Sequence, residues 1–207
     1  MLLIQISVSL LITPARFLAT SSTPLKSAFR FSSKGVPTVT IITSEFRSCS
    51  TFELNIILLK FDNNIIEITR CEDCGPATKL LGSLNKLEKN SLVILADDDH
   101  VYENYMIEKF FYFYSKTPNN AYSFYVHPLG KFGIGQGADG FAINTNHLIG
   151  IKNFYDKVVK NYKELFLYDD LWISYFLYFF KKNKILSLKD HLKKNNDGKS
   201  ALIYKKH

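Results

Sequence analysis

The stretch SLVILADDD, residues 91–99, decides the fold more than any other part of the chain. Its first six residues form a short and wholly apolar run, which is typical of a central parallel strand covered on both faces. Three adjacent carboxylates repel one another and are costly to bury, so the strand should end where they begin. We therefore expect Asp97, Asp98 and Asp99 at the carboxyl end of a central strand, where open α/β sheets bind ligands.

Patterns typical of strands and of helices alternate around this stretch. Strand-like runs occupy residues 38–43, 54–59, 65–69, 121–126 and 141–144. Helical patterns follow Gly75-Pro76, with Leu80, Leu81, Leu84 and Leu87 on one face, and cover residues 103–115, 151–161 and 169–182. This alternation predicts one α/β domain over residues 1–187, with a mostly parallel central sheet flanked by helices. Residues 17–53 match this pattern poorly, and residues 188–207 form a Lys-rich tail.

The first twelve residues are apolar enough to resemble an export or anchor signal, which remains the alternative. No Lys or Arg precedes the apolar run, however, and Gln5, Ser7 and Ser9 alternate with apolar residues. A period of two is typical of a strand with one buried face, so we expect the first core strand here. With no convincing export signal, we expect a cytoplasmic protein, peripherally associated with a membrane if the tail contacts one.

Charge and cysteine content limit the classes of partner. The net charge is +7 over 207 residues, and the segment from Lys181 to His207 carries all of it. Such a tail is either a solvated surface or a patch for anionic lipid headgroups or phosphates. The remaining body has no net charge, which argues against nucleic acid as a partner. Cys49, Cys71 and Cys74 are too few for a disulfide framework, and Cys71-x-x-Cys74 lacks the second pair of a zinc site.

Two acidic clusters carry the candidate chemistry. Asp97 and Asp99 form an Asp-x-Asp pair whose oxygens suit Mg²⁺ or Mn²⁺, with a diphosphate completing the coordination. Asp98 is available to cap a following helix, and a purely capping role for the whole triplet is the plain alternative. Asp169 and Asp170 open an apolar helix, where they cap it, supply a general base, or do both.

A glycine-rich segment, residues 133–140, lies in the middle of the chain. It contains a Gly-x-Gly-x-x-Gly pattern, but it does not connect a first strand to its helix as a dinucleotide site would. A loop that lets the backbone approach a substrate fits these glycines better.

Four motifs in the same order resemble GT-A-type glycosyltransferases similar to glycosyltransferase family 2. They are CEDCGPATKLLGSL (71–84), LVILADDDHVY (92–102), GADGFAINTN (137–146) and LYDDLWISYFLYF (167–179), and VSLLITPARF (8–17) resembles the opening strand and loop. The resemblance covers about residues 65–180 plus that opening piece. It implies a Rossmann-like GT-A domain and a divalent-metal-dependent transfer of a sugar from a nucleotide-diphosphate donor to a carbohydrate, lipid or protein acceptor.

The resemblance also implies roles for individual residues. Asp97 and Asp99 would bind the metal, and Asp170, or else Asp169, would be the catalytic base. The remaining expected contacts are with the nucleotide sugar (Thr13, Arg16, Lys79, Asp97, Asp98) and with the acceptor (Gly137, Asp139, Gly140, Trp172). For Lys79 the alternatives are the donor diphosphate and an acidic residue of the site.

Two other functions remain open at the level of sequence. A catalytically inactive relative that binds carbohydrate or nucleotide would explain the atypical residues 17–53. A sugar-phosphate nucleotidyltransferase would share the fold and metal, but it needs a glycine-rich phosphate loop after the first strand. The segment Thr13-Pro14-Ala15-Arg16 contains no glycine.

Overall fold

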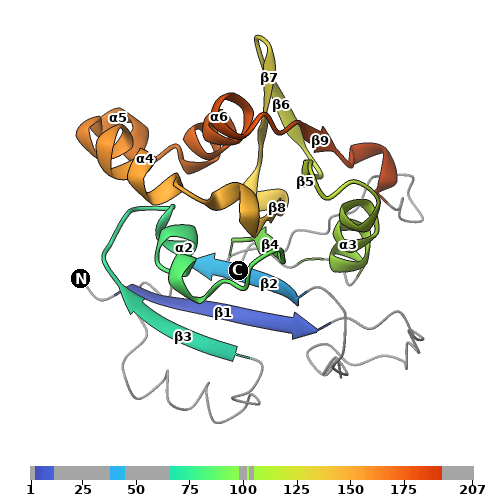
Figure 1. Ribbon diagram of the computed structural model, residues 1–207, viewed down its shortest axis with the longest axis horizontal. Helices are drawn as coiled ribbons and strands as arrows, with labels where there is room; N and C mark the ends of the chain where they lie inside the picture. Colours follow the sequence, from blue (N-terminus) through green and yellow to red (C-terminus); the bar gives the residue numbers. More distant parts are fainter. Residues whose placement is uncertain (1–2, 12–37, 45–65, 98–101, 103–104, 193–207) are drawn as a thin grey trace.

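The computed structural model describes residues 3–11, 38–44, 66–97, 102 and 105–192, and all structural statements below concern these residues. They form a seven-stranded mixed sheet and a separate two-stranded hairpin, with helices packed on the sheet (Figure 1). The strands of the sheet, in spatial order, are β3 (Ile66–Cys71), β1 (Leu3–Leu11), β2 (Thr38–Ser44), β4 (Leu92–Leu95), β8 (Phe141–Asn144), β5 (Ala121–Ser123) and β9 (Ile185–Ser187).

The strand directions correct one expectation. β2 is parallel to β4 and β5 is parallel to β9, but the other four neighbouring pairs of the described sheet are antiparallel. The sheet is therefore mixed, and the expected mostly parallel arrangement is wrong. Local hydrophobic patterns identify a strand but do not encode the direction of its neighbour, which is set by the connections between strands.

β4 lies in the interior of the sheet, as its sequence predicts. All four of its side chains are fully buried. Val93 and Leu95 belong to one core cluster, whereas Leu92 and Ile94 belong to the other. This alternation follows from the two-residue period of a strand, so both faces of β4 are covered.

Helices form the two outer layers. One core contains side chains from α2 (Thr78–Leu81), α4 (Ile151–Lys157) and α6 (Asp169–Lys181). The core on the other face contains side chains from α3 (Met106–Lys116). The remaining short helical elements are η1 (Leu84–Lys86), η2 (Gly137–Asp139), η3 (Thr145–Leu148), η4 (Val159–Asn161), α5 (Lys163–Phe166) and η5 (Lys189–His191).

Several elements differ from their sequence-based bounds. The helix after Gly75-Pro76 is a single turn, α2, because the chain turns at Gly82 and Ser83 before η1. The expected strand over residues 121–126 is divided into β5 and the start of β6 (Val126–Leu129). Part of the expected glycine-rich loop is the strand β7 (Phe132–Gly135), which pairs with β6 in a hairpin that projects beside α6 (Figure 1).

The other predicted elements agree more closely. β1, β2 and β3 coincide with the expected strands near the amino terminus, and β8 has its expected bounds. α6 ends one residue before the predicted helix, and α4 with η4 covers the predicted helical segment 151–161. The first residues of the Lys-rich tail pack on the domain, since Leu188 and Leu192 are buried. The expected strand at 54–59 lies outside the described residues.

Candidate functional site

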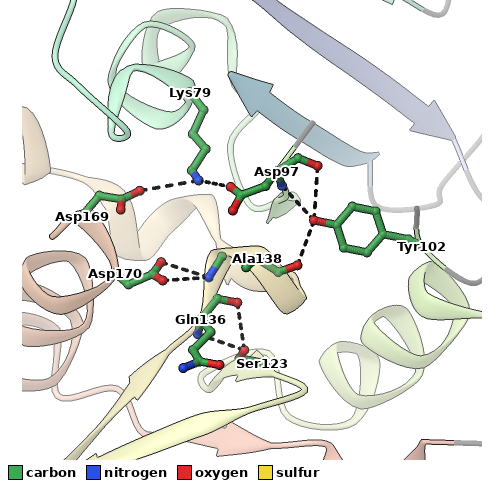
Figure 2. A network of polar contacts seen from close by, with 9 residues as sticks. Lys79, Asp97, Tyr102, Ser123, Gln136, Ala138, Asp169 and Asp170 are labelled. Atoms are coloured by element: carbon green, nitrogen blue, oxygen red, sulfur yellow. Dashed lines mark hydrogen bonds and ion pairs between the residues drawn. The ribbon is translucent and has the colours of Figure 1, made fainter. Parts of the chain in front are cut away.

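A buried lysine joins the two acidic clusters. The side chain of Lys79, on α2, is only 5% exposed, and its Nζ lies 2.6 Å from Oδ1 of Asp97 and 3.6 Å from Oδ2 of Asp169 (Figure 2). The shorter contact is a charge-assisted hydrogen bond, and the longer one is an ion pair without hydrogen-bond geometry. Residues from α2, from the end of β4 and from the start of α6 are thus brought together.

Asp97 follows directly on β4, and its backbone is held by Tyr102. The Asp97 amide donates a hydrogen bond to the Tyr102 hydroxyl at 2.8 Å, and that hydroxyl lies 3.0 Å from the carbonyl oxygen of Ala138, to which it donates. One phenol therefore connects the end of β4 to η2 (Figure 2). The Asp97 side chain is 32% exposed, so it is accessible from outside the core.

Asp169 and Asp170 lie in the first turn of α6, where the helix dipole favours negative charge. Both carboxylate oxygens of Asp170 accept a hydrogen bond from the Gly137 amide, at 2.9 and 3.1 Å. Asp169 is buried, and its Oδ2 has no hydrogen-bond partner among the described residues. The two neighbouring carboxylates therefore differ: one is held by a backbone amide, and the other faces Lys79.

Gly137 occupies a position where a larger residue would not fit easily. A Cβ there would lie 3.1 Å from Oδ1 of Asp170 and 3.3 Å from Nζ of Lys79. The preceding Gln136 is fixed by Ser123 on β5, whose hydroxyl accepts from the Gln136 amide at 3.1 Å and lies 3.2 Å from its carbonyl oxygen. These contacts hold the chain before η2 on β5, and the bond from the Gly137 amide to Asp170 holds η2 against the start of α6 (Figure 2).

The electrostatics favour a proton acceptor that titrates near neutrality. Burial, followed by the charge of Asp169, raises the pKa of Asp170 to about 7, against the opposing influence of Lys79. Burial likewise raises the pKa of Asp169, although Lys79 opposes this. Burial lowers the pKa of the Lys79 ammonium, but the charges of Asp169 and Asp97 outweigh it, and the net direction is upward. Lys79 therefore remains a cation at neutral pH.

One carboxylate oxygen of the cluster is available to a further cation. Lys79 is one positive charge facing the three carboxylates of Asp97, Asp169 and Asp170. Oδ2 of Asp97 accepts no hydrogen bond within the described part of the chain. Oxygen donors of this kind are suited to Mg²⁺ or Mn²⁺. Within the described residues, which leave out Asp98 and Asp99, no group of three or more His, Cys, Asp or Glu is placed to hold a metal ion.

The acceptor residues named from sequence are only partly at the site. Gly137 is there, and Asp139 follows on η2 but is 6% exposed. A Cβ on Gly140 would meet the Phe110 ring at 2.8 Å, in the core on the α3 side. Trp172 is 2% exposed and packs against Phe154 and Tyr155, so its expected acceptor contact is corrected to a core role. A tryptophan on the apolar face of a helix buries a large area when it packs into the core.

Four further predicted residues, Thr13, Arg16, Asp98 and Asp99, lie outside the described residues. The strand before the first two can be placed. β1 is antiparallel to β2, and β2 is parallel to β4. The carboxyl end of β1, at Leu11, therefore lies beside the amino-terminal ends of β2 and β4, at the opposite end of the strands from Asp97. The resemblance implied that Thr13, Arg16 and Asp97 all contact the nucleotide sugar, but the strand that leads to Thr13 ends away from Asp97.

Sequence reasoning did not single out Tyr102 or the Ser123–Gln136 contact. Tyr102 was part of a quoted motif, but a tyrosine seven residues after a strand carries no signal that its hydroxyl will accept a hydrogen bond from the chain at that strand's end. Ser123 lies in a strand pattern where Ser has no distinctive meaning. A separate groove of about 380 Å³ lies along α3, lined by Glu108, Lys109, Tyr112, Phe113, Lys116 and His191, and does not include the acidic cluster.

Comparisons of the chain with protein families, with curated proteins and with solved structures find no match. None of the helices in the described residues combines the length and hydrophobicity needed to cross a membrane. Function must therefore be argued from the chemistry of the site.

Proposed function

We propose that this chain is a glycosyltransferase that moves a sugar from a nucleotide-diphosphate donor to an acceptor hydroxyl. The observation that supports this most is the meeting of Asp97 and Asp169 at Lys79, with Asp170 beside them on the Gly137 amide. An Asp-x-Asp motif at the end of a central strand, close to a second acidic pair at a helix start, is the arrangement that the family resemblance implies. A GT-A-like domain is part of the same proposal.

Asp170 is the proposed catalytic base. A carboxylate with a pKa of about 7 is a stronger proton acceptor than an ordinary aspartate and is still half ionised at neutral pH. In the proposed reaction, the acceptor oxygen gives its proton to Asp170 as it forms a bond to the anomeric carbon. The bond from that carbon to the donor diphosphate breaks, and its electron pair leaves with the nucleoside diphosphate. The family resemblance suggests inversion at the anomeric carbon.

Asp97, together with Asp99, would hold Mn²⁺ or Mg²⁺, which when bound would neutralise charge on the leaving diphosphate. Lys79 orients Asp97 and Asp169 and offsets part of their mutual repulsion. Gly137 leaves the Asp170 carboxylate close to the backbone amide that orients it.

The test is release of nucleoside diphosphate from a panel of nucleotide sugars with Mn²⁺ or Mg²⁺ and mixed carbohydrate and lipid acceptors. We expect turnover of at least one donor, and we expect Asp170→Asn to lower kcat about 10²–10⁴-fold, as loss of a general base does. Asp156→Asn is the matched control, because Asp156 is an exposed carboxylate paired with Lys152 away from the cluster. Equal activity in the Asp170 and Asp156 variants would remove Asp170 from the reaction.

A further inference from the structure

A continuous aromatic surface covers the outer side of α6. Tyr175 and Phe179 are each 41% exposed, and Phe180 is 58% exposed. Neighbouring rings come from β7 and α4, which flank α6 in the fold (Figure 1). We call this surface the aromatic face, and it consists of Phe132, Phe154, Tyr175, Tyr178, Phe179 and Phe180.

Ring contacts make the aromatic face one patch rather than scattered residues. The centroids of Tyr175 and Phe179 are 4.5 Å apart, and Phe180 lies 5.2 Å from Phe154. On the other side, Phe132 stacks on Tyr178 at 5.7 Å. Single exposed apolar residues are common on protein surfaces, but a contiguous aromatic patch marks a site of interaction.

Lysines follow this face in the sequence, where α6 ends. Residues 171–184 contain Lys181, Lys182 and Lys184 and no Asp or Glu. Lys181 lies next to this face, with its Nζ 5.5 Å from the ring of Phe176, a core residue that stacks on Phe180. Aromatic rings beside long basic side chains are the composition of a surface that sits among anionic lipid headgroups.

The β6–β7 hairpin adds an exposed apolar tip beside this face (Figure 1). Leu129 is 46% exposed, and the turn Gly130-Lys131 follows it, with a positive φ of 56° at Gly130. Phe132, at the base of the turn, belongs to the aromatic face. The hairpin thus repeats the pairing of an exposed apolar residue with a lysine.

We propose that the aromatic face and the hairpin tip dock on the surface of an anionic lipid bilayer. The occupant is inferred from charge: Lys181 and Lys182 at the end of α6 and Lys131 at the hairpin tip complement an anionic bilayer, whereas two copies of this face would bring these lysines together. Phe, Tyr and Lys side chains place apolar rings and stems below the headgroups while the polar ends remain hydrated. α6, with 13 residues, is too short to cross the bilayer and lies on it instead. The proposal does not depend on the transferase activity.

The test is co-sedimentation of the full chain with vesicles of phosphatidylcholine alone or with phosphatidylglycerol added. We expect binding to vesicles containing phosphatidylglycerol and weak binding to neutral ones. The double variant Phe179→Ser, Phe180→Ser should lose at least tenfold in affinity, and Lys181→Glu with Lys182→Glu should lose binding that depends on the anionic lipid.

Matched controls lie on α3, on the other side of the sheet. Tyr112→Ser replaces an aromatic residue that is 49% exposed, and Lys109→Glu with Lys116→Glu reverses two charges there. These variants should bind vesicles as the unaltered chain does. The emission of Trp172, the single tryptophan of the chain and a core residue, checks that each variant is folded.

Three results would overturn the proposal. One is absence of binding to any vesicle by the folded protein. Another is unchanged binding by the Phe179, Phe180 variant, which would assign vesicle binding to the Lys-rich tail. The third is self-association of the chain that the same variant abolishes with no effect on vesicles, which would make the face a protein interface.

Discussion

At the scale of single residues, the site depends on a buried cation. Lys79 is nearly inaccessible, and two of the carboxylates around it come from segments far apart in the sequence. A buried ammonium is stable only when it is paired, and the same holds for a buried carboxylate such as Asp169. The ion pairs of Lys79 therefore stabilise the fold and also hold Asp97 and Asp169 in place at the candidate site.

Replacing Lys79 tests this connection. Lys79→Met keeps most of the volume but leaves Asp169 buried without its cation and Asp97 unpaired. We expect the free energy of unfolding, measured by urea titration, to fall by about 3 kcal/mol. Lys152→Met breaks the exposed pair with Asp156 and should change it by less than about 0.5 kcal/mol. Similar effects of both changes would show that the buried pairs contribute little.

The raised pKa of Asp170 predicts a pH dependence. The base must be deprotonated to accept a proton, so kcat/KM should rise about tenfold per pH unit below 7 and level off above it. Because Asp169 and Asp170 interact, the measured pKa belongs to the pair. The measurement is donor turnover from pH 5 to 9, and a flat profile across pH 7 would contradict the role given to Asp170.

Much of the site could be predicted from residue types, whereas its connections could not. Runs of aspartate beside apolar segments indicated Asp97, Asp169 and Asp170, and the order of motifs indicated Lys79. The bond between the Gly137 amide and Asp170 joins two segments whose approach depends on the tertiary fold. Trp172 was misjudged because a tryptophan in a motif is equally suited to sugar stacking and to core packing.

At the scale of elements, β4 and α6 position the site, and both were recognisable in the sequence. β4 is an isolated apolar run that ends in carboxylates, and α6 is a long apolar helix with an acidic first turn. Strand direction was not recognisable, since an apolar strand has the same pattern beside a parallel or an antiparallel neighbour. The division of residues 121–135 into β5 and the β6–β7 hairpin was missed because Gly130-Lys131, a two-residue hairpin turn with glycine first, was not recognised beside the glycine-rich segment 133–140.

The close packing of η2 on the start of α6 gives a prediction for Gly137→Ala. The added Cβ would press on the Asp170 carboxylate and the Lys79 ammonium, so Asp170 should move away from the Gly137 amide. We expect a loss of about 1–3 kcal/mol in the free energy of unfolding, together with lower kcat.

Gly82→Ala is the matched control for that change. Gly82 has φ −70° and ψ −20°, which any residue adopts, so this variant should keep both its stability and its activity. If the two alanine variants behaved alike, the tight fit at Gly137 would have no functional meaning.

At the scale of the whole molecule, the sheet separates two cores, and the two functions proposed above use different surfaces. α6 contributes to both proposals, because its first turn carries Asp169 and Asp170 and its later turns carry most of the aromatic face. The charge of the chain is divided in the same way. The acidic cluster lies at the end of β4, and the excess of lysine begins where α6 ends.

We propose that the acidic cluster at the end of β4 binds a divalent cation together with a nucleoside diphosphate. The most direct test is the thermal unfolding midpoint of the chain with Mn²⁺, with UDP or GDP, and with metal and nucleotide combined. We predict that one combination raises the midpoint by more than the sum of the shifts with metal alone and nucleotide alone. A ligand present at 100 times its Kd stabilises the folded protein by about 2.7 kcal/mol, which is large enough to measure. Asp99→Ala should abolish this gain and donor turnover while the protein remains folded. No shift with any metal and nucleotide, or an unchanged shift in the Asp99 variant, would contradict the account.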